Sequence, residues 1–435
     1  MNQVITAKLK LNTTPEQFAA LRKTQLAYRD ALNFVSEWSF ANGKTSNQDK
    51  LQKACYELIR EKFNLPAQMA CNIPRQVGAT YKTLWTKVKQ NVAARKAGRT
   101  RKRYKGLDQA PKYVSPTLTY NFGRDFGFKT ERRVSILSLD GRVVVSYEGY
   151  NKHIALIENG SAIGAAKLWY DKPRKQFYLL VSIKVERKEA EPTDHKTVIG
   201  VDVGQRYLAV VTDLKHNSKF FSGKTVVAVA NHYARLRKRL QVKGTRSATR
   251  RLVAIRGRER RFKLDTNHRI AKRIIERYPQ SIIGIEELTG IRERTKRKRG
   301  KKASVKQRRA NRRQAGWGYA ELHTALAYKA TLNGSMTIKV DANYTSKACP
   351  ECGHTTDKNR PNKGLMFVCQ NCGFELHSDL VGARNIALRT LLVRQDWAST
   401  GVLSLRPDVS DKEAKATRLQ RYAELRWSPD TSPRL

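Results

Sequence analysis

Four cysteines near the carboxyl end of the chain have the residue type and the spacing of a metal site. They form two Cys-x-x-Cys pairs, and a glycine follows each pair, so a tight turn can present both thiolates of a pair to one ion. The residues are Cys349, Cys352, Cys369 and Cys372. Four thiolates fill the tetrahedral shell of Zn²⁺ and leave no position open for a substrate. We therefore predict one structural zinc in a ribbon at residues 344–376; unrelated buried cysteines or two disulfides are the alternative.

Three carboxylates stand where a strand ends or a helix begins. Asp202 interrupts the apolar run 198–211, Glu286 ends a second apolar run, and Asp379 follows the ribbon and opens a helix-like segment. A charged carboxylate within a buried strand is costly unless it is paired or binds a metal. For Asp202 the alternative is a structural role, in which the turn at Gly204 satisfies the carboxylate.

The chemistry that three such carboxylates support is phosphodiester hydrolysis. Along the chain we expect three strands, then helix and strand, with a final helix, an order that can bring the acids together in an RNase H-like nuclease core. Convergent carboxylates supply hard oxygen ligands for two Mg²⁺ ions about 4 Å apart, which would activate water and stabilise the leaving oxygen. We therefore predict an α+β multidomain protein with a metal-dependent nuclease site.

The chain is 435 residues long and strongly basic. It has 86 Lys and Arg against 37 Asp and Glu, which gives a formal net charge of +49. A charge this large repels itself unless a polyanion neutralises it, so we expect a nucleic-acid partner. No apolar run approaches the roughly 20 residues that span a membrane, and the first residues lack the apolar stretch of a signal peptide. We expect an intracellular protein without a membrane partner, in which Cys55 and Cys71 are reduced and buried.

The first half of the chain is predicted to combine a helical region with a β region. Residues 14–97 carry helical stripes of apolar residues behind a helix-start signal that contains Pro15. Short alternating segments follow from residue 113 onward. The predicted strands are 4–11, 133–139, 143–147 and 176–183. We expect the later strands to form a small barrel that the first strand completes.

The second half should contain further helices and one more strand. Residues 226–278 indicate two basic helices separated near Gly244, and residues 317–332 indicate another helix. Residues 337–341 indicate a strand that leads into the ribbon. The pattern lapses after about residue 396, so we expect a peripheral or disordered tail.

Polar side chains in the helical region form a candidate base-reading face. Gln68, Asn72 and Gln76 recur every four residues, with Arg75 beside them, and amides of this kind can make paired hydrogen bonds to adenine. Pro74 can kink such a helix and spoil the stripe. A solvated polar face is the simpler alternative.

Two basic segments are candidates for phosphate contacts. Thirteen Lys or Arg and a single acid lie between residues 292 and 313, and a basic loop lies at residues 95–106. Such runs are usually solvated or disordered, but the charge of the whole chain favours ordering of residues 292–313 against phosphates. The candidate contact residues are Arg101, Arg103, Lys298, Arg299, Arg308 and Arg309.

Several motifs together resemble one known family, the transposon-encoded TnpB proteins (OrfB-type transposases) and the compact type V CRISPR effectors related to them. The resemblance covers most of residues 1–392. The motifs that carry it are Gly200-Val-Asp202-Val-Gly204, Ile285-Glu286-Glu287-Leu288, Tyr344-Thr345-Ser346, the two Cys-x-x-Cys-Gly turns, and Asp379 with Ala383-Arg384-Asn385-Ile386.

The resemblance implies a site and a domain order. It assigns the RuvC catalytic triad to Asp202, Glu286 and Asp379, with two catalytic Mg²⁺, and one structural Zn²⁺ to the four cysteines. It departs from the family at His377 and Val381, where members often have an acid and an Asn, which we interpret as variation around the triad. The implied domains are a wedge β-barrel (1–13 and 113–190), a helical recognition lobe (14–112), a RuvC nuclease (196–343 and 377–396), the ribbon (344–376) and the tail (397–435).

By the same resemblance, the protein is expected to be an RNA-guided DNA endonuclease of the prokaryotic cytoplasm, associated with the nucleoid. A guide RNA would select double-stranded target DNA by base pairing, while the protein reads only a short flanking motif. Both strands would be cut at one RuvC-type site. The alternatives are a guide-directed repressor without nuclease activity, against which the intact triad argues, and a strand-transfer transposase that uses a 3′-hydroxyl in place of water.

Overall fold

The computed structural model describes residues 2–98, 100–186, 191–195, 197–288, 304–316, 318–361, 364–401 and 412–426. The chain divides into two compact units, Asn2–Glu186 and Arg187–Leu435. Each unit has its own sheet and its own buried core.

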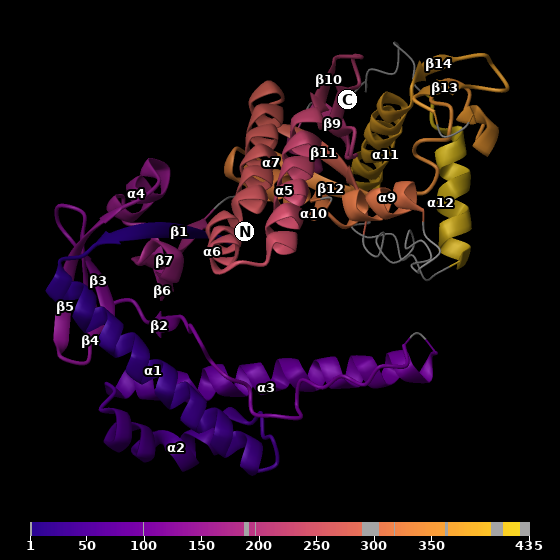
Figure 1. The fold of residues 1–435 in the computed structure, drawn as a ribbon. Helices are drawn as coiled ribbons and strands as arrows, with labels where there is room; N and C mark the ends of the chain where they lie inside the picture. Colours follow the sequence, from indigo (N-terminus) through magenta and orange to yellow (C-terminus); the bar gives the residue numbers. More distant parts are fainter. Residues whose placement is uncertain are drawn as a thin grey trace. The chain divides into compact units, whose positions relative to one another are not determined.

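Three helices form the helical part of the first unit, as the sequence predicted. They are α1 (Pro15–Ala41), α2 (Gln48–Phe63) and α3 (Ala67–Lys96), which lie side by side (Figure 1). Thr14 begins α1 with a capping box, because its hydroxyl accepts the Gln17 N–H and the Gln17 side chain accepts the Thr14 N–H. The apolar stripe of α1, with Leu21, Tyr28 and Leu32, is buried.

The β part of the first unit is one seven-stranded sheet in the order β2-β6-β7-β1-β5-β4-β3. The first strand lies between β7 and β5 and pairs antiparallel with both, so it completes the sheet as predicted. The two edge strands, β2 and β3, follow each other directly along the chain. Phe122 between them forms a single bridge with Phe126 of β3, which brings the two edges of the sheet nearly together. The strands are β1 (Asn2–Asn12), β2 (Leu118–Tyr120), β3 (Phe126–Lys129), β4 (Arg133–Ser138), β5 (Gly141–Glu148), β6 (Ala162–Asp171) and β7 (Gln176–Glu186), with α4 (Asn151–Glu158) before β6.

The second unit contains a five-stranded sheet in the order β10-β9-β8-β11-β12. The three strands β8, β11 and β12 are parallel, while β9 and β10 are antiparallel additions at one side. This arrangement is the RNase H-like core that the sequence predicted. The strands are β8 (Thr197–Asp202), β9 (Tyr207–Asp213), β10 (Ser218–Ser222), β11 (Ser281–Glu286) and β12 (Met336–Val340).

Helices cover both faces of this sheet. Alternate residues of β8 and β11 pack against α7 and α10 on one face, and the residues between them meet α11 on the other. The helices are α5 (Lys224–Lys243), α6 (Arg246–Ile255), α7 (Arg258–Arg277), α9 (Val305–Ala315), α10 (Tyr319–Leu332), α11 (Ser378–Thr400) and α12 (Lys412–Glu424). The two-stranded ribbon consists of β13 (Met366–Val368) and β14 (Glu375–His377), and 3₁₀ turns occur at Lys172–Arg174, Pro192–Asp194 and Asp357–Asn359.

Two sequence predictions in the second unit are wrong in detail. Residues 226–278 form three helices, because the chain breaks at Gly257 as well as at Gly244, and both glycines have positive φ. The tail beyond residue 396 is not without order, since α11 extends to Thr400 and α12 follows. No helix within the described ranges is long and apolar enough to span a bilayer.

Candidate active site

The three acidic residues singled out in the sequence meet at one edge of the second sheet. Asp202 and Glu286 are the last residues of the parallel neighbours β8 and β11, so both lie at the carboxyl edge. Asp379 is in the first turn of α11. One turn later, a Cβ placed on Gly382 would lie 3.3 Å from the Asp202 carboxylate, so the start of α11 is in close contact with Asp202.

Two glycines in register allow this close approach of α11. Gly200 of β8 pairs with Gly284 of β11. A Cβ on Gly200 would lie 2.1 Å from the carbonyl oxygen of Ala383, and one on Gly284 would lie 1.9 Å from the Thr390 hydroxyl. A larger residue at Gly200 would therefore push the helix, and Asp379 with it, away from the sheet, and one at Gly284 would displace the Thr390 side chain.

The electrostatics of the three carboxylates show that they share one environment. Burial raises the pKa of Asp202 well above its usual range, and the charges of Glu286 and Asp379 raise it further, while Arg360 opposes both effects. Burial also raises the pKa of Glu286, which is 8% exposed. Such crowding of acids favours either a shared proton or a bound cation, and their oxygen atoms suit a hard divalent ion.

Two side chains keep Glu286 in place and favour its charged form. Thr345 Oγ1 donates a hydrogen bond of 2.5 Å to Glu286 Oε1, and together with the nearby guanidinium of Arg389 it lowers the pKa of Glu286 against the effect of burial. Arg389 is itself 2% exposed and lies with its guanidinium carbon 4.1 Å from the ring centre of Tyr422 in α12. The buried amide of Asn385 donates to the carbonyl oxygens of Thr345 and Ala348, at 2.7 and 2.8 Å.

Sequence reasoning assigned no role to Thr345, Asn385 or Arg389. Thr345 and Asn385 do lie inside motifs that carry the family resemblance, and this was the available signal. No sequence signal pointed to Arg389, because its partners Asp341 and Tyr422 lie far away in the sequence.

Asp379 is held by its own helix start and by the ribbon. His377 is the N-cap of α11, and its Nδ1 accepts the backbone N–H of Asp379 at 3.2 Å. The imidazole also lies edge-on to Tyr207 and Phe220, with ring centres 5.4 and 5.3 Å away. From the ribbon, Arg360 Nη2 lies 3.9 Å from Asp379 Oδ1. His377, one of the two positions at which the chain departs from the family that it resembles, therefore contacts Asp379 directly.

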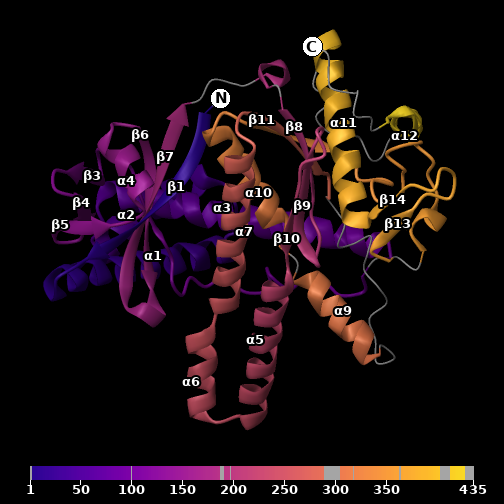
Figure 2. The ribbon, with the colours of Figure 1, turned by 90° about the horizontal axis from the view of Figure 1, so that it is seen from above.

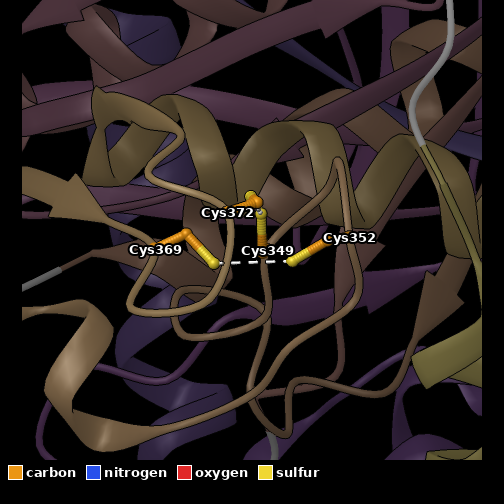
Figure 3. Close-up of side chains that lie close together, drawn as sticks. All are labelled: Cys349, Cys352, Cys369 and Cys372. Carbon is orange, nitrogen blue, oxygen red and sulfur yellow. Dashed lines mark hydrogen bonds between the residues drawn. The ribbon is translucent and has the colours of Figure 1, made fainter.

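The four cysteines of the ribbon converge on one point (Figure 3). Their sulfur atoms all lie within 4.8 Å of one another. The Sγ atoms of Cys349 and Cys372 are 3.7 Å apart, and those of Cys352 and Cys369 are 3.5 Å apart. Both distances exceed the roughly 2 Å of a disulfide, so the thiols are free and fit a four-coordinate metal site.

The amide face of α3 does not have the exposure that base reading requires. Asn72 is 7% exposed, and its Nδ2 donates to the carbonyl oxygen of Thr119. Gln76 is half-buried and accepts a hydrogen bond from the hydroxyl of Tyr28. The burial of Asn72 and its contact with Thr119 correct the prediction for Asn72, because its amide stabilises the packing of α3, while base reading by Gln76 stays a prediction. Gln68 is half-buried and Arg75 is exposed.

The other candidate contact residues are basic and lie in different parts of the chain. Arg101 and Arg103 are exposed, and Arg103 forms an ion pair with Asp108 at 2.6 Å. Arg308 is exposed on α9, and Arg309 lies on the same helix. Lys298 and Arg299 lie outside the described residues.

Two protein-family models match segments of this chain that lie almost wholly in its second unit. The family model OrfB_IS605, described as a probable transposase, matches residues 181–290, and that of the Cas12f1-like TNB domain matches residues 319–386. The two matched segments include Asp202, Glu286, Asp379 and all four ribbon cysteines.

Individual relatives match only part of their own length. The CRISPR-associated endodeoxyribonuclease Cas12f1 of Sulfoacidibacillus thermotolerans is 26% identical over 264 residues, which are 57% of this chain and 58% of that protein. The putative RNA-guided DNA endonuclease InsQ of Escherichia coli K12 is 38% identical over 76 residues, which are 18% of this chain and 19% of that protein. The chain thus spans 43–58% of the length of the curated relatives that it matches over longer segments.

Among solved structures, that of the mini-RNA-guided endonuclease CRISPR-Cas_phi3 aligns with 90% of this chain and 92% of its own, at 11% identity and a TM-score of 0.47. The Cas12f1-sgRNA-target DNA complex aligns with 88% of this chain and 99% of its own, at 16% identity and a TM-score of 0.34. The sequence matches confirm what the motifs predicted: the chain is related to the TnpB (OrfB-type) proteins and to the compact type V effectors.

Proposed function

We propose that this protein is an RNA-guided DNA endonuclease that hydrolyses phosphodiester bonds of both DNA strands at a single site. The observation that carries the proposal is the meeting of Asp202, Glu286 and Asp379 at one sheet edge, with the pKa of Asp202 raised by burial and by the other two charges. The curated relatives named above are endodeoxyribonucleases, and one of them is described as RNA-guided.

The catalytic role of the carboxylates is to hold divalent metal. Asp202, Glu286 and Asp379 present the oxygen donor set that Mg²⁺ prefers, and two such ions would activate a water molecule and stabilise the leaving oxygen. The chain's own part is to keep those carboxylates ionised and in position. Thr345 and Arg389 do so for Glu286, and Arg360 and the backbone N–H of Val203 do so for Asp202.

Guide RNA and double-stranded target DNA are the proposed partners. The net charge of +49 indicates a polyanionic partner that neutralises it. Base pairing with the guide would choose the target, and the protein would read a short flanking motif. Exposed Arg75, Arg101, Arg103 and Arg308 are proposed to contact phosphates rather than bases.

The two units have different tasks in this proposal. The first unit supplies the wedge and the recognition lobe, and the second supplies the nuclease. The four thiolates hold one structural Zn²⁺, which fixes the ribbon and thereby the position of Arg360 beside Asp379. The ribbon would then affect catalysis by positioning Arg360 and would take no part in the chemical step.

The proposal is tested by purifying the protein with the RNA that accompanies it and sequencing that RNA. A plasmid that contains the complementary sequence is then incubated with the complex and Mg²⁺. Guided hydrolysis predicts double-strand breaks with free 5′-phosphate and 3′-hydroxyl ends at the matching sequence. Products joined to donor DNA would identify a strand-transfer transposase instead, and tight binding without any break would identify a repressor.

A further inference from the structure

The segment from the outer half of α5 to the start of α7, residues 235–261, is an unusually basic helical hairpin, here called the basic hairpin. It contains twelve Lys or Arg and one acid, Glu259. Eleven of the twelve side chains are exposed. The exposed residues are Arg235, Lys238, Arg239, Lys243, Arg246, Arg250, Arg251, Arg256, Arg258, Arg260 and Arg261.

The one acid of the basic hairpin is already engaged. Glu259 accepts from Arg237 at 2.8 Å and from Lys263 at 2.7 Å, and these ion pairs join α5 to α7. None of the eleven exposed cations has an ion-pair partner in the part of the chain that the structure describes. Their mutual repulsion destabilises the hairpin, and a polyanion that lies against it would relieve this repulsion.

The cations of α5 form a stripe with the geometry of a phosphate-binding surface. Arg235, Arg239 and Lys243 are four residues apart, so they lie on one side of the helix with neighbouring Cβ atoms about 5–6 Å apart. This separation lets successive side chains reach successive phosphates along a strand. On the opposite side of α5, Val227 and Ala230 line a cavity of about 350 Å³ shared with α7 and α9, so the stripe faces away from the protein interior.

The basic hairpin projects from the same sheet edge as the three acids. The N–H of Gly223, directly before α5, donates to the carbonyl oxygen of Arg206 at 2.7 Å, in the loop that follows Asp202. At the other end, α7 finishes at Arg277, just before β11 begins at the opposite edge. Figure 2 shows α5 and α6 extending past the ends of β9 and β10. A helix of 20 residues, the length of α5, reaches about 30 Å.

We propose that the basic hairpin binds the phosphate backbone of the target DNA next to the three acids and so holds the strand that is cut. The proposal rests on the function proposed above, because it takes the substrate of the acids to be DNA. Target DNA is favoured over guide RNA as the occupant because the strand to be cut must approach the edge from which the hairpin projects. Contacts of this kind are to phosphates, so they are independent of base sequence.

The test compares two triple variants of the full guide-loaded complex. The hairpin variant is Arg239→Gln, Lys243→Gln and Arg246→Gln. The control variant is Lys215→Gln, Lys219→Gln and Arg273→Gln, which removes the same charge from exposed residues near the opposite edge of the sheet. For each complex we would measure the amount of RNA that co-purifies, and the affinity for a matched DNA duplex over a range of salt concentrations.

The hairpin variant should retain its RNA and lose DNA affinity by about tenfold or more at moderate salt. The slope of log affinity against log salt should become shallower by roughly 2 to 3, about 0.9 for each lost phosphate contact. The control should match the parent in both readouts. Loss of co-purifying RNA in the hairpin variant would assign the surface to the guide and overturn the proposal, as would an unchanged salt slope. If the parent complex itself binds matched DNA but never cuts it, the proposed function fails while the hairpin result still stands.

Discussion

At the scale of single residues, the site is defined by carboxylates that repel one another. Burial and the charges of Glu286 and Asp379 raise the pKa of Asp202, while the Arg360 guanidinium and a backbone N–H act in the opposite direction. Folding brings these acids together at a cost that only a cation or a shared proton relieves. Acids whose pKa values are shifted in this way occur mainly at functional sites and are uncommon in purely structural clusters.

Removal of any one acid should abolish cutting without abolishing DNA binding. For Asp202→Ala, Glu286→Ala and Asp379→Ala we expect cleavage rates at least about 10³-fold below the parent, because in the proposed mechanism each variant removes a ligand of the metal that activates water. DNA affinity of the guide-loaded complex should change by less than about threefold, since phosphate contacts elsewhere dominate it. Cleavage assays and filter binding on the same preparations measure the two effects. Substantial cleavage by one variant would remove that residue from the triad.

The hydroxyl of Thr345 should set the acid limb of the pH–rate profile. The proposed activity requires ionised Glu286, so cleavage should be present above the pKa of this residue and be lost as pH falls through it. The pKa of Glu286 is raised by burial and lowered by the Thr345 hydrogen bond, so Thr345→Ala should raise it further and move the acid limb to higher pH. Thr345→Ser keeps the donor and should keep the parental profile. A parallel loss of rate at every pH in Thr345→Ala would show that the residue only supports the local structure.

At the scale of secondary-structure elements, α11 is the part that assembles the site. It carries Asp379 in its first turn, touches Asp202 at Gly382, and presents Asn385 and Arg389 to the segment that holds Glu286. All of these contacts depend on how closely the helix approaches the sheet. The glycine pair of β8 and β11 therefore has an indirect but large influence on the positions of the carboxylates.

Gly200→Ala should reduce both stability and activity. Its Cβ would lie 2.1 Å from a backbone atom of α11, so the helix must shift, at a cost of about 1–3 kcal/mol or more. Thermal unfolding and cleavage rate measure the two consequences. Gly127→Ala is the matched control, since nothing lies within 4 Å of the Cβ that it would add in β3. A parental melting temperature and rate for Gly200→Ala would contradict the packing described here.

Loss of one ribbon thiolate should unfold the ribbon and only then affect cutting. A structural zinc site couples metal binding to folding with roughly 10 kcal/mol or more. For Cys352→Ser we expect less than one zinc per chain, increased proteolysis near residues 344–376, and reduced cleavage. Cys71→Ser is the control, because this thiol is outside the cluster. A zinc-free protein that cuts at the parental rate would refute the assignment.

At the scale of the whole molecule, sequence reasoning succeeded where the signal was local. The cysteine pairs, the strand-end acids and the helical stripes of residues 14–97 are short-range patterns, and the structure contains the corresponding elements. Sequence reasoning failed where the hydrogen-bond partner of a residue lies far along the chain. Asn72 was interpreted as a surface amide because nothing nearby reveals that Thr119 takes its hydrogen bond.

The tail beyond residue 396 shows the same limitation, because its order depends on partners that are distant in the sequence. Its helix α12 has little apolar character of its own, so the sequence pattern predicted no order. The helix α12 is ordered by its contacts with α11. The ring of Tyr422 stacks on Arg389, and Arg421 pairs with Asp396 at 2.7 Å. Contacts between charged and aromatic side chains leave no periodic trace in a sequence. The family resemblance could not supply them either, because it ends near residue 392.

The claim that unites these scales is that an RNA chooses where the three acids cut. The most direct measurement replaces the targeting segment of the co-purifying RNA by a new sequence and maps the breaks on a plasmid that carries both the old and the new target beside the same flanking motif. RNA-guided cleavage predicts that both strands are cut at the new target, that the old target is spared, and that Asp202→Ala complexes cut neither. Breaks that stay at the old target, or that occur without regard to the RNA, would contradict it.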